Sequence, residues 1–533
     1  MSTTLVIRGG TVHDGNGGPG RPADVLVEGD RIVAVGPGVG DPGAPVLDAT
    51  GMVVAPGFVN VLSHAYFSLE NDGRGLSDLY QGVTTEIFGE GFSIGPFTPE
   101  VKALLAPGLE PGDPELTWDR LPEFLGHLER KGVAQNVASF VGAHNLRMIG
   151  AGAENRPMTA AELDRVRGIL DEEMADGALG LGSALIYPPG AFASTDELVA
   201  LSEVVARHGG MYISHMRSEG DHFLDAVDEL IEIGRRAGLP AEIYHLKAAG
   251  RHNWPKMERA VERVEAARAA GQKVTADIYP YIAGQTSLGA SIPPDFHEGG
   301  YEALADRLRD PAERARIREA VVTPSDRWEN LYLAAGGAKG VLLLPDASGP
   351  AAKYRGLSLQ EVADSNGTEP VEMLLQLVEQ EPALNSMYFM MDEDVLRTAL
   401  RNPWVSVCSD GQSIAAEAPY VDTPTHPRTY GSFARILGKY VREESLLSLG
   451  EAVRRMTSLP AENLGLRDRG VIAPGKFADL VVFDPDTIGD RATYEQPHQY
   501  ATGVKHVVVN GEPALADGIP TGLVAGRALR RGQ

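Results

Sequence analysis

The sequence predicts an α/β protein: a TIM (β/α)8 barrel with a small β-sandwich formed by both termini and an inserted subdomain. Eight apolar segments of strand length recur through the middle of the chain, and most of the gaps between them have helical patterns. Short strand-like segments crowd both ends. Apolar strands that alternate with helices form a parallel sheet covered on both faces. Eight such strands favour a closed barrel over an open, doubly wound sheet.

The two ends of the chain, residues 1–56 and 465–533, are predicted to form the β-sandwich. Their strand-like segments are separated by Gly, Asp and Pro turns. The segments are TLVIRGGTV, ADVLVEGDRIVAVG and GMVVAPG near the N-terminus, and FADLVVFDP, VKHVVVNGE and GLVAGRALR near the C-terminus. Neither end has enough strands for a core of its own. We therefore expect one joint domain rather than two separate hairpins with open edges.

The predicted barrel spans residues 57–464. Its eight strand segments, in chain order, are VVAPGFVNVLSHA, VTTEIFGEGF, NVASFVGAH, ALGLGSALIY, GMYISHMRS, AEIYHLKAAG, KVTADIYPY and WVSVCSDG. Two of the helices between them have clear boundary signals. Residues 159–176 have Thr159 and Glu162 at the spacing of a capping box and stop before a glycine, and residues 194–208 repeat this pattern.

Residues 288–368 break the alternation of strands and helices. This stretch is too long for one crossover and contains helix and strand candidates of its own. It is therefore predicted to be an inserted subdomain over the mouth of the barrel. The segment SMYFMM, which begins at residue 386, is a ninth strand candidate and competes for a place in the barrel.

Composition and charge restrict the partners of this chain of 533 residues. Its formal net charge of −25 would be repelled by nucleic acid and by anionic membranes, so neither is expected as a partner. No apolar run approaches the roughly 18 to 20 residues of a membrane span, and the N-terminus lacks the pattern of a signal peptide. A single cysteine, Cys408, fits a reducing compartment. We expect a cytoplasmic protein with a small-molecule substrate, and an oligomer is left open.

Polar side chains end almost every predicted barrel strand, where the active sites of such barrels lie. Two neutral histidines and a carboxylate form a competent site for a divalent, zinc-like ion. Glu90, His215 and His245 are therefore the candidate ligands of one ion. Each residue alone would more often be satisfied by a neighbouring hydrogen bond. Their convergence on three strand ends of one barrel favours the metal site.

Asp410 ends the last predicted strand, in the segment VSVCSDG. A carboxylate at this place can take a proton from water and return it to a leaving amine. The alternative is an Asx turn at the strand end. Cys408, two residues earlier, is expected to be unreactive core, as lone buried cysteines usually are.

Several cationic side chains follow the same strand ends. Arg217, Lys247 and Arg428 could form the cationic side of a pocket for an anionic substrate, with hydroxyl groups from Tyr187 and Tyr281. Each could equally be an ion-pair residue on the surface.

Longer motifs resemble the amidohydrolase superfamily and, within it, the D-aminoacylase (N-acyl-D-amino-acid deacylase) group, over nearly the whole chain. The matching stretches include APGFVN, QGVTTEIFGEGFSIGP, DIYPYIAGQTSL, HPRTYGSFARILG and a long block from LSLGEAV to LVVFDP. The stretches LIYPPGAFASTDEL, SHMRSEG and HLKAAG are specific to the deacylases. The resemblance implies zinc-dependent hydrolysis of the linear amide of N-acyl-D-amino acids, which yields a carboxylate and a free D-amino acid.

The resemblance also implies roles for individual residues. His215 and His245 match the paired metal ligands, and Asp410 matches the acid/base aspartate. The residues expected to contact the substrate are Lys247, Tyr187, Tyr281, Ser287, Arg217 and His144. Of these, Lys247, Tyr187 and Tyr281 match residues that hold the carboxylate, Ser287 is a weaker match, and His144 would help to stabilise the oxyanion.

Two departures from the family pattern concern the metal. Glu90 stands where a cysteine ligand is usual, and a carboxylate should leave the ion more Lewis acidic. The usual His-x-His after the first strand is broken, because Leu62 takes the place of the first histidine and Asn60 that of an aspartate. One ion is therefore the simpler expectation. His64 should point towards the site, more as a neighbour of substrate or ligands than as a ligand.

Two other functions remain open from the sequence. A cyclic amidase of the dihydroorotase or hydantoinase type usually bridges two metals with a carboxylated lysine on the fourth strand, and ALGLGSALIYPP contains no lysine. A non-catalytic binding protein descended from an amidohydrolase would fit the broken His-x-His. The retention of His215, His245, Asp410 and a carboxylate at Glu90 opposes that alternative.

Overall fold

Eight parallel strands close into a barrel in the computed structural model, which describes residues 4–532 apart from 41–42, 106–113, 326, 346–348, 383 and 423–424. The strands are β6 (Phe58–Asn60), β7 (Val83–Phe88), β8 (Asn136–Ser139) continued by β9 (Val141–Gly142), β10 (Gly180–Ala184), β11 (Met211–His215), β12 (Ala241–Ile243), β13 (Val274–Ile278) and β17 (Val405–Val407). They form two parallel ladders, β6-β7-β8 and β9-β10-β11-β12-β13-β17. A parallel bridge between Ser63 and Gly411 joins their outer edges. The predicted TIM barrel and all eight of its strands are confirmed.

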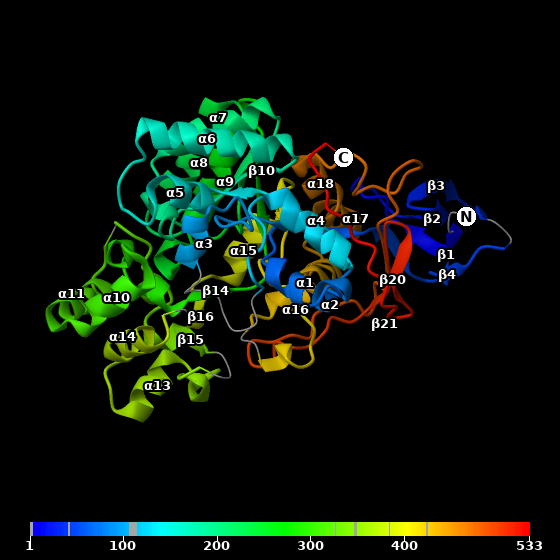
Figure 1. The fold of residues 1–533 in the computed structure, drawn as a ribbon. Coiled ribbons are helices and arrows are strands. Elements are labelled where there is room, and N and C mark those ends of the chain that lie inside the picture. The colour runs from blue at the N-terminus through cyan, green and yellow to red at the C-terminus, as the bar shows by residue number, and fades with distance from the viewer. Residues whose placement is uncertain are drawn as a thin grey trace.

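Helices cover the outside of the barrel (Figure 1). They are α1 (Tyr66–Asn71), α2 (Leu76–Leu79), α3 (Pro99–Leu105), α4 (Leu121–Lys131), α5 (Ala143–Ala151), α6 (Ala160–Ala175), α7 (Thr195–Arg207), α8 (Phe223–Ala237), α9 (Lys256–Ala269), α15 (Glu393–Leu400), α16 (Arg428–Arg435), the π-helix η9 (Ile436–Glu443), α17 (Leu449–Met456) and α18 (Ser458–Leu464). The capping box predicted for α6 is present, because Thr159 and Glu162 bond each other's backbone N–H groups. No helix in the described ranges is both long and apolar enough to cross a membrane.

The two ends of the chain share one nine-stranded sheet. Its strands are β1 (Thr4–Val12), β2 (Arg21–Glu28), β3 (Arg31–Gly36), β4 (Val46–Asp48), β5 (Val53–Pro56), β18 (Leu480–Phe483), β19 (Val504–Val509), β20 (Glu512–Ala516) and β21 (Ile519–Pro520). Antiparallel pairing of β5 with β18 joins the N-terminal strands to the C-terminal ones, and apolar side chains from both ends pack into a core of their own. Both ends therefore contribute strands to one sheet and side chains to one core.

The segment GLVAGRALR does not join this sheet. It lies against the barrel instead, where Val137 of β8 donates its N–H to the Arg527 carbonyl and accepts the N–H of Leu529. Leu529 packs in the barrel-interior cluster with residues at the beginnings of the strands, including Leu179 and Met211. The end of the chain therefore helps to close the bottom of the barrel.

The insertion is longer than the predicted residues 288–368: it runs from 283 to 389 and contains its own antiparallel sheet. The sheet consists of β14 (Ala283–Ser287), β15 (Val341–Leu344) and β16 (Asn385–Phe389), in the order β14-β16-β15. Its helices are α10 (Gly300–Arg309), α11 (Pro311–Val322), α12 (Leu331–Ala334), α13 (Leu359–Asn366) and α14 (Pro370–Gln380). The ninth strand candidate, SMYFMM, forms most of β16 and therefore lies outside the barrel.

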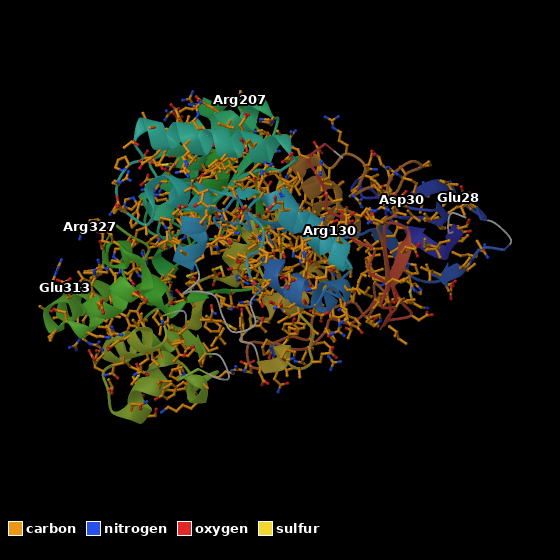
Figure 2. All side chains as sticks on the ribbon, in the orientation of Figure 1. Glu28, Asp30, Arg130, Arg207, Glu313 and Arg327 are labelled. Atoms are coloured by element: carbon orange, nitrogen blue, oxygen red, sulfur yellow. The ribbon has the colours of Figure 1, made fainter. Side chains whose placement is uncertain are left out.

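The insertion and the terminal sheet lie at opposite ends of the molecule, with the barrel between them (Figure 1). Charged side chains cover all three parts. Figure 2 labels Glu313 and Arg327 on the insertion, Arg207 and Arg130 on barrel helices, and Asp30 on the terminal sheet.

Glu242 of β12 is one of several carboxyl groups buried inside the barrel. Its Oε2 atom accepts hydrogen bonds from Thr275 Oγ1 at 2.5 Å and from Asn463 Nδ2 at 3.1 Å. Burial, together with the nearby charge of Asp277, raises the pKa of Glu242 to about 8. Because an unfolded glutamate titrates near pH ~4.3, the folded protein retains a proton that the unfolded chain releases. Stability from this group is complete at low pH and is lost as pH rises through about 8.

We expect the variant Glu242→Gln to lose less stability than the wild type between pH 5 and pH ~8.5, because glutamine does not titrate. The difference in free energy of unfolding should reach a few kcal/mol at the higher pH, since each pKa unit is worth about 1.4 kcal/mol. Urea denaturation at both pH values measures it. The exposed Glu302 of α10, changed to glutamine, controls for loss of a carboxylate. An unchanged pH dependence in Glu242→Gln would contradict the assignment.

Candidate metal centre and active-site cavity

A cavity of about 590 Å³ opens where the carboxyl ends of the barrel strands face the insertion sheet. The polar residues of the cavity wall come from both parts and include His64, Glu90, His144, Tyr187, His215, Glu219, His245, Lys247, Gln285, Thr286, Ser287, Asn385, Asp410 and Arg428. This is the end of the barrel at which the sequence placed the chemistry.

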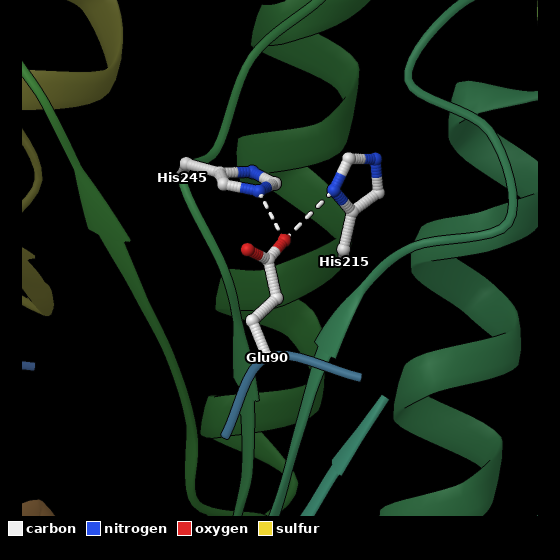
Figure 3. Close-up of side chains that lie close together, drawn as sticks. All are labelled: Glu90, His215 and His245. Carbon is white, nitrogen blue, oxygen red and sulfur yellow. Dashed lines mark hydrogen bonds and ion pairs between the residues drawn. The ribbon is translucent and has the colours of Figure 1, made fainter. Parts of the chain in front are cut away.

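Glu90, His215 and His245 all line this cavity, and Figure 3 shows their side chains close together. The Oε1 atom of Glu90, just after β7, accepts hydrogen bonds from His215 Nδ1 at 2.9 Å and from His245 Nε2 at 2.8 Å. One potential ligand atom from each residue lies within 4.8 Å of the other two. The three candidate ligands of the sequence are therefore neighbours in space.

Two site residues have an unusual backbone conformation. His245 has a φ of 34° and Asp410 a φ of 50°, in the left-handed region that residues other than glycine rarely adopt. Each is held by a hydrogen bond of its N–H group, to Asp277 Oδ1 at 2.7 Å and to the Leu62 carbonyl at 3.0 Å, respectively. Strained residues of this kind cluster at functional sites, where the surrounding structure holds them in place.

The carboxylates of the site dominate its electrostatics. Burial alone would raise the pKa of Glu90, but the charge of His245 and hydrogen bonds from His215, His245 and His64 hold it well below its usual value. Burial and Lys247 oppose protonation of His245, yet Glu90 and Glu219 raise the pKa of His245 to about 10. Carboxylates that keep the imidazole of His245 protonated in this way strongly attract positive charge to the site.

His64 lies between two carboxylates. Its Nε2 atom is 3.1 Å from Glu90 Oε2 and 3.0 Å from Asp410 Oδ1. Despite burial, the hydrogen bonds to Asp410 and Glu90 raise the pKa of His64 to about 9. His64, Glu90 and Asp410 form a second group that could hold an ion. As the sequence predicted, the His64 side chain points into the site. It contacts Glu90, one of the candidate ligands, directly.

Asp410 is also paired with a buried arginine. Arg428 Nη1 at the start of α16 donates to Asp410 Oδ2 at 2.5 Å. Burial raises the pKa of Asp410, but Arg428 and the hydrogen bond from His64 outweigh it and lower the value. Asp410 is therefore an anion at neutral pH and can accept a proton.

The donor set of the Glu90 group fits a divalent ion. Two histidines and a carboxylate form the three-ligand set of catalytic zinc sites, and one potential ligand atom from each lies within 4.8 Å of the other two. The buried Nε2 atom of His215, which has no hydrogen-bond partner among the described residues, faces Glu219 instead, at 3.7 Å.

Glu219 is a site residue that the sequence analysis missed. Its carboxylate is buried and accepts a hydrogen bond from Lys247 Nζ at 2.6 Å. It also lies 3.1 Å from His245 Nδ1. A signal was available in the sequence, because Glu219 is the acidic residue of SHMRSEG, four residues after His215.

Four predicted substrate contacts line the cavity: Lys247, Tyr187, Ser287 and His144. His144 differs from its expected role at the oxyanion. Burial lowers the pKa of His144, so the ring is neutral, and its Nε2–H donates to the Ala184 carbonyl at 2.8 Å. A neutral ring bonded in this way has no second N–H to donate to an oxyanion.

Tyr281 and Arg217 lie elsewhere, outside the described lining of the cavity. The Tyr281 hydroxyl donates to Asp490 Oδ2 at 3.1 Å. Arg217 forms a paired contact with Glu229, at 2.9 Å from each of two guanidinium nitrogens. Both residues follow the strands that the sequence predicted. Their side chains bind Asp490 and Glu229 instead, and the sequence does not predict that these residues lie nearby. Cys408, as expected, is buried core.

A protein-family model described as Amidohydrolase family matches residues 350–514. The D-aminoacylase of Alcaligenes xylosoxydans xylosoxydans is 35% identical over 530 residues, which cover 99% of this chain and 97% of that protein. The N-acyl-D-glutamate deacylase of the same organism is 36% identical, with coverage of 99% and 96%.

A solved structure of similar fold is that of N-acyl-D-glutamate deacylase from Bordetella bronchiseptica. It is complexed with zinc and a phosphonate inhibitor that mimics the tetrahedral intermediate of the reaction. The TM-score is 0.81 at 31% identity, and the match covers 99% of this chain and 100% of that one.

If Glu90, His215 and His245 are the ligands, the purified protein should contain about one divalent ion per chain, as a three-ligand site allows. Residues that only support a ligand typically change metal affinity about 10- to 100-fold. Because Glu90 is itself a proposed ligand, Glu90→Gln should lower the affinity at least about 100-fold. Metal analysis together with competition against a chelator measures both quantities.

The control variant is His64→Ala, which leaves the three ligands in place and should retain the ion. Wild-type affinity in Glu90→Gln would place the metal elsewhere. Two ions bound with equal affinity in the wild type would show that the second group is also filled.

Proposed function

Since the chain belongs to the amidohydrolase family and to its D-aminoacylase group, we propose that it hydrolyses N-acyl-D-amino acids to a carboxylate and a free D-amino acid. The observation that carries this proposal is a single cavity that contains the Glu90 group, the anionic Asp410 and the buried ammonium of Lys247. These are the parts that hydrolysis of an amide next to a carboxylate requires. The similar glutamate deacylase, solved with zinc and a mimic of the tetrahedral intermediate, supports the same reaction type.

We infer that the ion is zinc and that one ion is sufficient. The donor set of two histidines and a carboxylate suits zinc. A second ion at His64 and Asp410 is disfavoured by the guanidinium of Arg428, 2.5 Å from the Asp410 carboxylate, and by the buried, apolar Leu62. When bound, zinc would polarise the scissile carbonyl and lower the pKa of its water towards about 7.

Asp410 performs the proton transfers in this proposal. Held as an anion by Arg428, its carboxylate accepts a proton from the attacking water. As the C–N bond breaks, Asp410 returns that proton to the leaving nitrogen, so the D-amino acid departs as a neutral amine. The carboxylate is thereby restored for the next cycle.

Lys247 and two hydroxyl groups fix the substrate. The ammonium of Lys247 pairs with the α-carboxylate, and the hydroxyls of Tyr187 and Ser287 lie in the same wall. Burial raises the pKa of Tyr187 further above its usual value, so this hydroxyl stays protonated and donates a hydrogen bond. With the carboxylate fixed and the amide over the metal centre, only one configuration at the α-carbon directs the side chain away from the ligands.

The cavity favours a neutral substrate side chain. Lys247 and Arg428 are the only lysine and arginine among the described residues of its wall. Arg428 is already paired with Asp410, and the protonated imidazoles of His64 and His245 are paired with Glu90. Once Lys247 binds the α-carboxylate, a second carboxylate would be left without a cation, which is costly in a buried site. The apolar residues of the wall include Phe67, Phe92, Ala184, Ile186, Pro188, Leu331 and Met390.

The cyclic-amidase alternative lacks its bridging group here, because β10 (Gly180–Ala184, GLGSA) contains no lysine. The alternative of a non-catalytic binding protein makes no use of the Asp410 anion beside the Glu90 group. Neither is favoured by an observation of its own.

We expect the zinc-loaded protein to release amine from N-acetyl-D-amino acids and to be at least roughly tenfold slower on the L-series, since misplacement of the amide by about 1 Å costs up to 10²-fold. Asp410→Asn should lower kcat by about 10²- to 10⁴-fold, the usual contribution of a general base. An amine-release assay on both series measures this, with metal content determined on the same samples. Hydrolysis by Asp410→Asn at the wild-type rate would exclude the acid/base role.

Matched substrates test the preference for neutral side chains. N-acetyl-D-glutamine and N-acetyl-D-glutamate have nearly the same shape and differ in charge, as do the asparagine and aspartate pair. We expect kcat/KM to be at least roughly tenfold higher for the amide member of each pair, equal to about 1.4 kcal/mol of binding to the transition state. A preference for the acidic member would mean that the site contains a cation that this cavity does not account for.

A further inference from the structure

We propose that Glu219 is a positioning residue for the amide hydrolysis proposed above, and that Glu329 of the insertion holds Glu219 in place. The insertion would then be a working part of the active site as well as a cover over it. The proposal rests on the proposed function for its kinetic arm alone, because its metal-binding arm requires no substrate.

The carboxylate of Glu219 touches groups from two different parts of the site. It lies 2.6 Å from Lys247 Nζ and 3.1 Å from His245 Nδ1, on the side of the ring opposite to Glu90. Its other oxygen is 3.7 Å from His215 Nε2. One buried anion therefore faces both candidate metal-binding histidines and the lysine that receives the substrate carboxylate.

This arrangement has a physical reason on each side. A histidine that binds a metal through one ring nitrogen usually donates its other N–H to a carboxylate, which fixes the ring and makes it a better ligand. Burial of the Lys247 ammonium would be costly without a counter-charge. Without Glu219, Lys247 Nζ would still lie 2.6 Å from His245 Nδ1, and that contact competes with the N–H that a metal-binding His245 needs.

Both backbone groups of Glu219, its carbonyl and its N–H, are hydrogen-bonded. Its carbonyl accepts the N–H of Ala249 at 2.7 Å. Its own N–H donates to Glu329 Oε2 at 3.1 Å. The same oxygen accepts from Ser218 Oγ at 2.8 Å and from the Gly220 N–H at 3.2 Å. Three successive residues of the loop after β11 thus bind one carboxylate oxygen of the insertion.

The approach of the two segments is close. A Cβ atom added to Gly220 would lie 2.8 Å from Glu329 Oε1, nearer than side chains normally approach. Glu329 directly precedes Asn330, which caps α12, and α12 supplies Leu331 to the cavity wall. The insertion therefore contributes a wall residue and the anchor of Glu219 from positions two residues apart in the chain.

The first arm of the test is metal affinity of the full chain, measured by competition of the zinc-depleted protein with a chelator. Glu219→Gln removes the charge but retains the shape, and should lower zinc affinity about 10- to 100-fold, as is typical for a residue behind a ligand. Glu329→Ala should lower it in the same direction, by roughly tenfold. Glu302→Ala, an exposed glutamate on α10 of the insertion, is the matched control and should bind zinc as the wild type does.

The second arm separates positioning from general damage to the fold. At saturating zinc, Glu219→Gln and Glu329→Ala should raise KM for an N-acetyl-D-amino acid more than they lower kcat, because Lys247 loses its fixed place. Glu329→Gln retains an acceptor oxygen for the three donors and should recover at least half of what Glu329→Ala loses. Thermal unfolding and near-UV circular dichroism verify that each variant is folded.

The outcomes distinguish the parts of the proposal. Wild-type zinc affinity in both Glu219→Gln and Glu329→Ala would overturn it. A defect in Glu219→Gln without one in Glu329→Ala would overturn the role of the insertion. Absence of hydrolysis by the wild type on every N-acetyl-D-amino acid would defeat the proposed function, whereas loss of zinc affinity in the variants would still support the positioning role.

Discussion

The active site depends on one buried anion, the carboxylate of Glu90. Burial makes a charge of this kind unfavourable unless it is paired and hydrogen-bonded, and three imidazoles supply that pairing. His215 and His245 bond one oxygen, and His64 contacts the other. The histidines come from separate strand ends of the barrel. Their contacts with Glu90 therefore fix the relative positions of the loops that carry them.

From Glu90 the charges alternate outwards in two directions. On one side the order is Glu90, His64, Asp410 and Arg428, and each group contacts the next within 3.1 Å. On the other side His245 joins Glu90 to Glu219, which pairs with Lys247. Each line ends on a cation. The two ends differ in consequence: Arg428 keeps Asp410 ionised as a base, whereas Lys247 lies at the wall where an anionic substrate can bind.

The sequence predicted the parts of this structure that obey a local rule. Strand-length apolar segments and capping residues predicted the barrel, and the rule that active sites lie at the carboxyl ends of strands placed Glu90, His215, His245 and Asp410 together. The sequence did not predict the direction of side chains that contact residues distant in the chain. Tyr281 and Arg217 follow the correct strands, yet their side chains bind Asp490 and Glu229 instead. Glu329 could not be found, because it meets Glu219 across 110 residues and no period or motif links them.

The barrel and the insertion supply different parts of the site. Every proposed metal ligand and the proton-transferring carboxylate stand on barrel strand ends, where parallel strands on both sides restrain the backbone. The opposite wall of the cavity comes from the antiparallel sheet, through Gln285, Thr286 and Ser287 of β14 and Asn385 and Tyr388 of β16. None of these five residues is a proposed metal ligand. Substitutions there can therefore alter the choice of acyl group or side chain while the ligands stay in place. The exception is the segment around Glu329, because its hydrogen bonds extend to the loop that carries Glu219, and a change there should reach the metal ligands as well as the substrate.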